Sequence, residues 1–184
     1  MIVDALILAG GRSSRLGGTA KSRLAVNGVT LLDRTIQAAV IMGVRRTVLI
    51  GDEVRDDLVT LREDPPFAGP VASIASGLRA LSGDADAVLV LACDMPMIVD
   101  ALPAVFSGFI GDGVIAIDRG RSQPLVILVR TSALDAAVHA LPTIVDASMR
   151  SLLASLDLTE IVVPDGSTDD VDTWDDAQRL GAVR

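Results

Sequence analysis

The sequence predicts an α/β fold with a mostly parallel central sheet. Short apolar runs alternate with longer amphipathic segments along its 184 residues, which is the pattern of strands connected by covering helices. No proline-rich or serine-rich linker divides the chain, and no repeat recurs at a fixed period. A chain of this length can bury a sizeable core as one unit, so we expect a single domain over residues 1–184.

The pattern assigns six strands and six helices. The strands are expected at Val3–Leu8, Thr47–Ile50, Ala87–Leu91, Gly113–Ile117, Leu125–Val129 and Glu160–Val163. The helices are expected at Leu31–Met42, Val71–Leu81, Ile98–Phe109, Ser132–Leu141, Met149–Leu156 and Thr173–Leu180. Ligands of such sheets bind beyond the carboxyl ends of the strands. Functional residues should therefore lie in the segments that follow the strands.

Composition and charge exclude several classes of function. With three Phe, one Trp and no Tyr, the core should be aliphatic and the active site poor in stacking rings, which argues against a platform for single-stranded nucleic acid. A formal charge of -8 disfavours nonspecific nucleic-acid binding and anionic membrane surfaces. The one cysteine excludes an internal disulfide, and no run approaches a membrane span. We expect a cytoplasmic protein without nucleic-acid or membrane partners.

The first strand leads into a glycine-rich loop that suits a phosphate ligand. Gly10 and Gly11 allow a sharp turn that exposes backbone N–H groups to an anion. Arg15 and Lys21 follow within ten residues and can neutralise the phosphates of a triphosphate. Ala20 before Lys21 excludes a Walker A loop, and the dinucleotide fingerprint is absent. The alternative is an ordinary glycine-rich turn with solvated basic residues.

Two aspartates are candidate metal ligands. Asp94 follows the apolar run Ala87–Leu91, where an unpaired carboxylate is costly to bury. It could hold Mg²⁺, which prefers one or two carboxylates plus substrate phosphates, or it could cap the next helix. Near the end of the chain, Thr173 can cap the last helix, whereas Asp172 just before it could turn inward as a second metal carboxylate.

Two further loops offer polar or closely approachable positions. The segment from Asp64 to Gly69-Pro70 is stiffened by prolines and opens a helix whose first residues are small, so that a ligand could come close. Gln123 precedes Pro124 at the start of a predicted strand and carries an amide that can recognise polar groups. For both, a plain connecting loop is the alternative.

Taken together, these motifs resemble the molybdenum cofactor guanylyltransferases, which are part of the MobA-like NTP transferase family. The motifs occur in order and nearly from end to end: Leu8-Ala9-Gly10-Gly11 with Arg15 and Lys21, Asp64 with Gly69-Pro70, Cys93-Asp94-Met95-Pro96, Gln123-Pro124 and Asp170-Val171-Asp172-Thr173. The resemblance implies a Rossmann-like three-layer domain that transfers GMP from GTP to the phosphate of molybdopterin with Mg²⁺ and releases pyrophosphate. We expect a monomer, with transient contacts with other proteins of cofactor biosynthesis left open.

The resemblance also implies roles for individual residues. Arg15, Lys21 and Asp94 would be catalytic, with Asp94 and Asp172 binding the metal. Gln123 and Arg150 would bind the acceptor. The nucleotide would be bound by Leu8, Ala9, Gly10, Gly11, Lys21, Asp64, Gly69, Pro70 and Asp94.

Three departures from the family pattern concern the choice of base. Ala20 stands where the family often has Asp, Ser73 replaces the glycine that closes the G-P-x-x-G pattern, and Gly51-Asp52 replaces an expected asparagine. The alternatives are therefore a CTP-dependent molybdopterin cytidylyltransferase and a phospholactate guanylyltransferase, which would keep the phosphate and metal residues. A noncatalytic nucleotide-binding domain would need the loop but no metal carboxylate.

Overall fold

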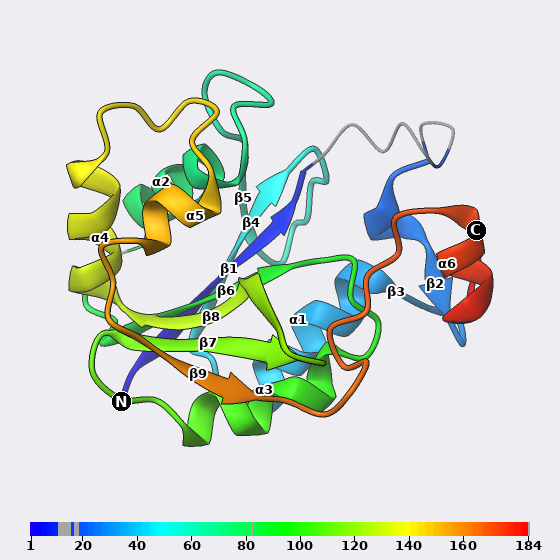
Figure 1. Ribbon diagram of the computed structural model, residues 1–184. Helices are drawn as coiled ribbons and strands as arrows, with labels where there is room; N and C mark the ends of the chain where they lie inside the picture. Colours follow the sequence, from blue (N-terminus) through cyan, green and yellow to red (C-terminus); the bar gives the residue numbers. More distant parts are fainter. Residues whose placement is uncertain (11–15, 17–18, 82, 184) are drawn as a thin grey trace.

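The centre of the molecule is a seven-stranded sheet with the order β5-β4-β1-β6-β8-β7-β9 (Figure 1). The computed structural model describes residues 1–10, 16, 19–81 and 83–183. The strands are β1 (Val3–Ala9), β4 (Arg46–Gly51), β5 (Val59–Leu61), β6 (Ala87–Ala92), β7 (Gly113–Asp118), β8 (Arg121–Arg130) and β9 (Leu158–Val162). In this sheet only β8 runs antiparallel to its neighbours. The predicted mostly parallel sheet is confirmed.

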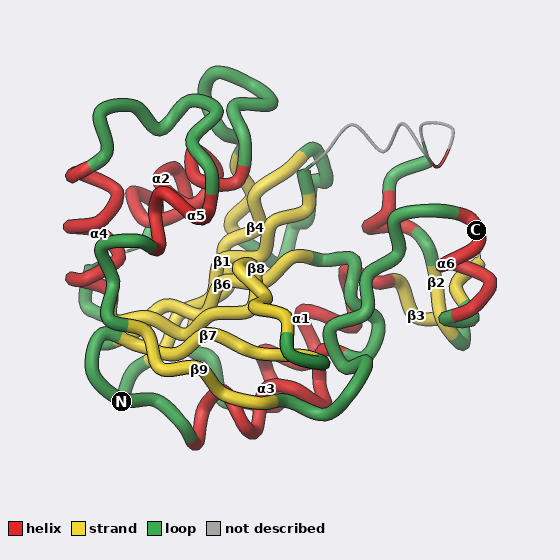
Figure 2. Tube along the Cα trace, in the orientation of Figure 1, coloured by secondary structure: helices red, strands yellow, loops and turns green. Residues whose placement is uncertain are grey.

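Helices cover both faces of the sheet and complete three layers (Figure 2). On one face, α2, α4 and α5 bury aliphatic side chains such as Ile74, Leu134 and Leu152 against the strands. On the other, α1 and α3 bury residues such as Ala39 and Leu102. The helices are α1 (Leu31–Ile41), α2 (Pro70–Ala80), α3 (Ile98–Ser107), α4 (Thr131–Ala140), α5 (Met149–Leu153) and α6 (Trp174–Arg179). The Rossmann-like three-layer architecture is thus confirmed.

A small second sheet, which the sequence pattern did not predict, pairs a short hairpin that follows η2 with the last strand of the chain. Its order is β10-β2-β3, with β2 (Ala25–Val26), β3 (Val29–Thr30) and β10 (Ala182–Val183). Leu24 and Leu31 pack there against Val171, beside the 3₁₀ helix η2 (Lys21–Arg23). This packing holds the segment before α6 close to the end of β1.

The antiparallel strand β8 begins earlier than predicted, at Arg121 rather than Leu125. It forms a hairpin with β7 through the two-residue turn Arg119-Gly120, whose φ angles are 48° and 72°. Positive φ at both positions is typical of the turn that matches strand twist. Because β8 is antiparallel, its first residues, including Gln123, lie at the edge where the parallel strands end.

No helix among the described residues is both long enough and apolar enough to cross a membrane.

Candidate active site

The first functional cleft lies where the parallel strands end. It is a cavity of about 700 Å³ that meets the last residues of β1 and β6 and the first turn of α2. The lining residues are Leu8, Ala9, Gly10, Ala20, Lys21, Ser22, Asp52, Glu53, Glu63, Phe67, Gly69, Pro70, Ser73, Ala92, Cys93, Asp94, Leu125, Asp146 and Asp172. Among these described residues Lys21 is the only cation, and six are acids. An anionic ligand would therefore need further positive charge to bind here.

Two glycines are required by the shape of this cleft. At Gly69, the N-cap of α2, φ is 91°, which favours glycine, and Pro70 then takes the first helical position. At the end of β4, a Cβ on Gly51 would lie 2.8 Å from the carbonyl carbon of Ala9. The absence of a side chain at Gly51 therefore lets β4 and β1 end side by side at the floor of the cleft.

Lys21 holds two aspartates from distant parts of the chain. Its Nζ donates to Asp94 Oδ2 at 2.8 Å and to Asp172 Oδ1. Asp94 follows β6, Asp172 precedes α6, and Lys21 begins η2. Burial lowers the pKa of Lys21, but attraction to Asp94 and the hydrogen bonds to both carboxylates outweigh it, so the pKa is raised. Lys21 therefore stays charged at neutral pH.

Neither aspartate is used as a helix cap, which was the alternative for Asp94. The last helix is capped by Thr173, whose side chain accepts from the Asp176 N–H while the Asp176 carboxylate accepts from the Thr173 N–H. α3 starts after Met97 without a side-chain cap. Both aspartates instead accept hydrogen bonds from Lys21 and line the first cavity.

A third carboxylate completes a group that suits a divalent cation. One carboxylate oxygen each of Asp94, Asp170 and Asp172 lie within 4.8 Å of one another. The pKa of Asp170 is raised by burial and by the charges of Asp94 and Asp172, because Lys21 alone does not neutralise three carboxylates. Hard carboxylate oxygens in excess of the available positive charge are the donors that Mg²⁺ prefers. These residues therefore fit the expected metal.

The segment that carries Asp170 and Asp172 is anchored by a buried carboxylate. Asp118, at the end of β7, accepts hydrogen bonds from the Gly166 and Thr168 N–H groups at 3.0 and 3.1 Å and from Thr168 Oγ1 at 2.7 Å. Burial raises the pKa of Asp118, but these hydrogen bonds outweigh it, so the pKa is lowered. Further along, the Val171 N–H donates to the Asp94 carbonyl at 3.0 Å. The anchor thus aligns the aspartate segment with the end of β6.

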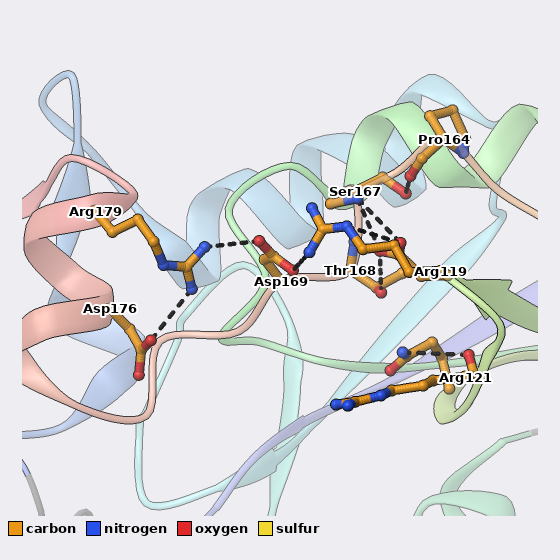
Figure 3. Close-up of polar contacts among 11 residues, drawn as sticks. Arg119, Arg121, Pro164, Ser167, Thr168, Asp169, Asp176 and Arg179 are labelled. Carbon is orange, nitrogen blue, oxygen red and sulfur yellow. Dashed lines mark hydrogen bonds and ion pairs between the residues drawn. The ribbon is translucent and has the colours of Figure 1, made fainter.

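A second cavity of about 790 Å³ adjoins the first and shares Ala92, Asp94 and Leu125 with it. Figure 3 shows its charged rim, where Asp169 accepts from Arg119 at 2.9 Å and from Arg179 at 2.7 Å. Arg121 also lines this cavity, and its guanidinium makes no hydrogen bond or ion pair with any residue that the structure describes. The second cavity therefore offers one uncommitted positive charge.

The predicted site residues separate into three groups. Most lie together: Leu8, Ala9, Gly10, Lys21, Gly69, Pro70, Asp94 and Asp172 line the first cavity, and Gln123 lines the second. Asp64 and Arg150 are exposed and line neither cavity. Gly11 and Arg15 lie outside the described residues.

Sequence reasoning missed several residues of the two cavities. Asp170 was not predicted as a ligand, although it lies two positions before Asp172, a spacing that a loop can turn to one side. Asp64 was predicted to bind the nucleotide and its neighbour Glu63 was not, and no role was predicted for Arg121. Phe67 places a ring in a cleft that was expected to be poor in aromatic groups. Cys93, which also lines the first cavity, is a buried free thiol.

Comparison with known proteins shows the family to which this chain belongs. The family model described as the MobA-like NTP transferase domain matches residues 5–160. A Chloroflexus aggregans protein named a probable molybdenum cofactor guanylyltransferase is 34% identical over 145 residues, covering 73% of this chain and 68% of that protein. A Shewanella baltica (strain OS185) protein named molybdenum cofactor guanylyltransferase is 28% identical over 143 residues, covering 72% of this chain and 71% of that protein.

A solved structure is similar over nearly the whole chain. A nucleotidyl transferase from Methanothermobacter aligns over 98% of this chain and 96% of its own, with a TM-score of 0.78 and 22% identity. At that level of identity the likeness establishes a shared fold.

Proposed function

The chain belongs to the MobA-like NTP transferase family, and on this premise we propose that it transfers GMP from GTP to the terminal phosphate of molybdopterin. The products are molybdopterin guanine dinucleotide and pyrophosphate. The observation that carries the proposal is the position of Asp94, which pairs with Lys21 and lines both cavities. A nucleotide in the first cavity and an acceptor in the second would meet at this carboxylate.

The reaction needs no nucleophile from the protein. An oxygen of the acceptor phosphate attacks the α-phosphorus of GTP, an O–P bond forms, and the bond from the α-phosphorus to the bridging oxygen breaks, releasing pyrophosphate. Catalysis then consists of positioning and of neutralising charge. Asp94, Asp170 and Asp172 would hold Mg²⁺, which when bound supplies concentrated positive charge near the phosphates.

On the nucleotide side, Lys21 is the described residue best placed to bind a phosphate. An ammonium group has three donors, and two of those of Lys21 go to Asp94 and Asp172. The third remains for a phosphate oxygen. The backbone of Leu8, Ala9 and Gly10 and the Gly69-Pro70 turn would enclose the nucleoside, as the resemblance implies. Gly11 and Arg15 stay part of the proposal as further phosphate ligands.

On the acceptor side, we assign the second cavity to molybdopterin. Gln123 can donate to a polar acceptor group, and Arg121 carries the uncommitted guanidinium. A guanidinium binds phosphate with two parallel hydrogen bonds. The terminal phosphate of the acceptor is therefore expected near Arg121, with Arg150 as the candidate that the resemblance favours.

Replacing each arginine by alanine decides between these two positions. Arg121→Ala should raise the KM for molybdopterin about tenfold or more, with the affinity for GTP unchanged, since an ionic hydrogen bond contributes about 1.5–3 kcal/mol. A rise in KM for Arg150→Ala and none for Arg121→Ala would reverse the assignment.

Pyrophosphate release tests the function as a whole. The protein is incubated with molybdenum cofactor and either GTP or CTP, with Mg²⁺ or with EDTA. We expect release only with GTP, acceptor and Mg²⁺ together. Release with CTP alone would make it a cytidylyltransferase, and transfer from GTP to phospholactate but not to molybdenum cofactor would change the acceptor. Mg²⁺-dependent binding of nucleotides without any transfer would favour a noncatalytic binding domain.

A further inference from the structure

Glu63 is a buried acid in the first cavity for which the family resemblance gives no role. It follows β5, its side chain is almost fully buried, with 7% of the residue exposed, and it lines the cavity together with Phe67 and Gly69. Its Oε1 accepts a hydrogen bond from the Phe67 N–H at 2.9 Å. Its Oε2 is buried and has no hydrogen-bond partner, which is true of no other buried side-chain oxygen or nitrogen among the described residues.

A buried carboxylate oxygen without a donor is unfavourable, and a ligand that supplies the donor removes the penalty. The neighbouring Asp64 does not share this position, because it is exposed and lines neither cavity. Glu63 is therefore the acid of this loop that a ligand in the cleft can satisfy.

The surroundings of Glu63 suit a flat heterocyclic base. Phe67 lines the same cavity, and the guanidinium carbon of Arg62 lies 4.5 Å from the centroid of its ring. An aromatic ring can stack on a heterocyclic base. The carboxylate and the ring together can bind the edge and the face of one base.

The chemistry of the carboxylate selects among the bases. A carboxylate only accepts hydrogen bonds. Guanine presents two neighbouring donors, N1–H and the 2-amino group, whereas adenine and cytosine present a ring-nitrogen acceptor beside their amino group. We propose that Glu63, rather than Asp64, recognises the guanine base through N1–H and the 2-amino group. This inference rests on the proposed function, because it assumes that the first cavity binds the nucleotide.

Binding measurements without acceptor test the proposal. The nucleotides are GTP and inosine triphosphate, which lacks only the 2-amino group, each with Mg²⁺ and followed by calorimetry. The unsubstituted protein should bind GTP about 10- to 100-fold more tightly than inosine triphosphate, as expected for one hydrogen bond to a charged group. In Glu63→Gln the GTP affinity should fall by a similar factor and the ratio should approach one, while pyrophosphate binding stays unchanged.

Three variants make the outcome specific. Glu160→Gln makes the same chemical change at an exposed residue of β9 that lines neither cavity, and it should bind both nucleotides like the unsubstituted protein. Glu63→Asp keeps the negative charge but moves it away from the base, and should also lose GTP affinity. This variant keeps the proposal testable if Glu63→Gln does not fold. If Asp64→Asn loses the discrimination and Glu63→Gln keeps it, Asp64 recognises the base and the proposal is wrong.

Failure of the inference differs from failure of the proposed function. Tight GTP binding that Glu63→Gln leaves unaltered overturns only the inference. Binding of CTP in preference to GTP overturns the inference and the choice of base, but keeps nucleotidyl transfer. No Mg²⁺-dependent binding of any nucleotide overturns both proposals.

Discussion

Two charged clusters lie at opposite ends of the same strands and differ in how completely their carboxylates are hydrogen-bonded. At the amino ends, Arg45 binds the fully buried Asp4 with Nε and Nη2 at 3.0 and 2.8 Å, and binds Asp84 with Nη1 and Nη2 at 2.8 Å. At the carboxyl ends, Lys21 faces Asp94 and Asp172, with Asp170 close by.

The difference lies in the excess negative charge, which is one carboxylate at the amino-end cluster and two at the carboxyl-end cluster, and in how completely the carboxylates are hydrogen-bonded. Every carboxylate oxygen of Asp4 and Asp84 accepts a hydrogen bond from one planar guanidinium, so the amino-end cluster is closed. The carboxyl-end cluster sets one point charge against three carboxylates, and the pKa of Asp170 is raised as a result of burial and of that crowding. A closed cluster stabilises the fold, whereas an open one is available to bind a cation and its ligand.

The largest expected effect is on turnover, at the open cluster. Lys21→Ala should lower kcat about 10²–10³-fold, which is the typical loss when one preorganised charge donor is removed. Pyrophosphate release at saturating GTP measures the loss, and circular dichroism checks that the fold is retained. Unchanged turnover in a folded variant would remove Lys21 from the active site.

At the closed cluster the large effect should fall on stability. Arg45→Met leaves the buried Asp4 carboxylate without its partner, and we expect Tm to fall by about 5–10 °C. The folded fraction should keep its normal rate of pyrophosphate release. A loss of turnover without a loss of stability would show that the two clusters are not divided between stability and function.

A smaller effect with a distinct pH dependence is expected at Asp118. Its pKa is lowered from the usual 3.8, so its stabilisation is present at neutral pH and is lost as pH falls through the lowered value. Asp118→Asn turns an amide donor toward N–H groups and should lower Tm at pH 7 by a few degrees, about the effect of one buried unsatisfied group.

The pH dependence separates this role from a general loss of charge. Below pH 4 the Tm of Asp118→Asn and of the unsubstituted protein should converge in thermal melts. Asp165→Asn, an exposed change in the same segment, should alter neither value. A difference in Tm between Asp118→Asn and the unsubstituted protein that is constant down to pH 3 would contradict the role of the ionised carboxylate.

The smallest expected effect has the opposite sign. Because the pKa of Asp170 is raised, its ionised form is a cost to folding that is absent at low pH and appears as pH rises through that pKa. Asp170→Asn should therefore raise Tm slightly at pH 7 without metal, and should reduce the increase in Tm that Mn²⁺ or Mg²⁺ produces. A lower Tm without metal would indicate that Asp170 is a structural residue like Asp4.

The sequence was sufficient wherever a signal is local. The apolar run that ends at Gly10, the aspartate after β6 and the lysine after the glycine-rich loop can each be recognised within ten residues, and strands that end at one edge bring them together. Thr173 also signals its own helix cap, which leaves Asp172 for another role.

Pairing between distant segments could not be predicted in the same way. Whether β8 runs parallel or antiparallel depends on the turn at Arg119-Gly120, where Gly120 was the available signal. The two-residue strands β2, β3 and β10 are too short to show a period and exist because they pair with one another. Glu63 and Asp64 are adjacent acids of similar chemistry, and only the folded loop decides which one is buried.

The central claim is that the open cluster serves nucleotidyl transfer from GTP. The most direct measurement is pyrophosphate release with GTP and molybdenum cofactor, with Mg²⁺ and with EDTA, in the unsubstituted protein and in Lys21→Ala. We expect release that requires Mg²⁺ and acceptor and that falls about 10²–10³-fold in the variant. Release that is unaffected by EDTA and by the loss of Lys21 would contradict the claim.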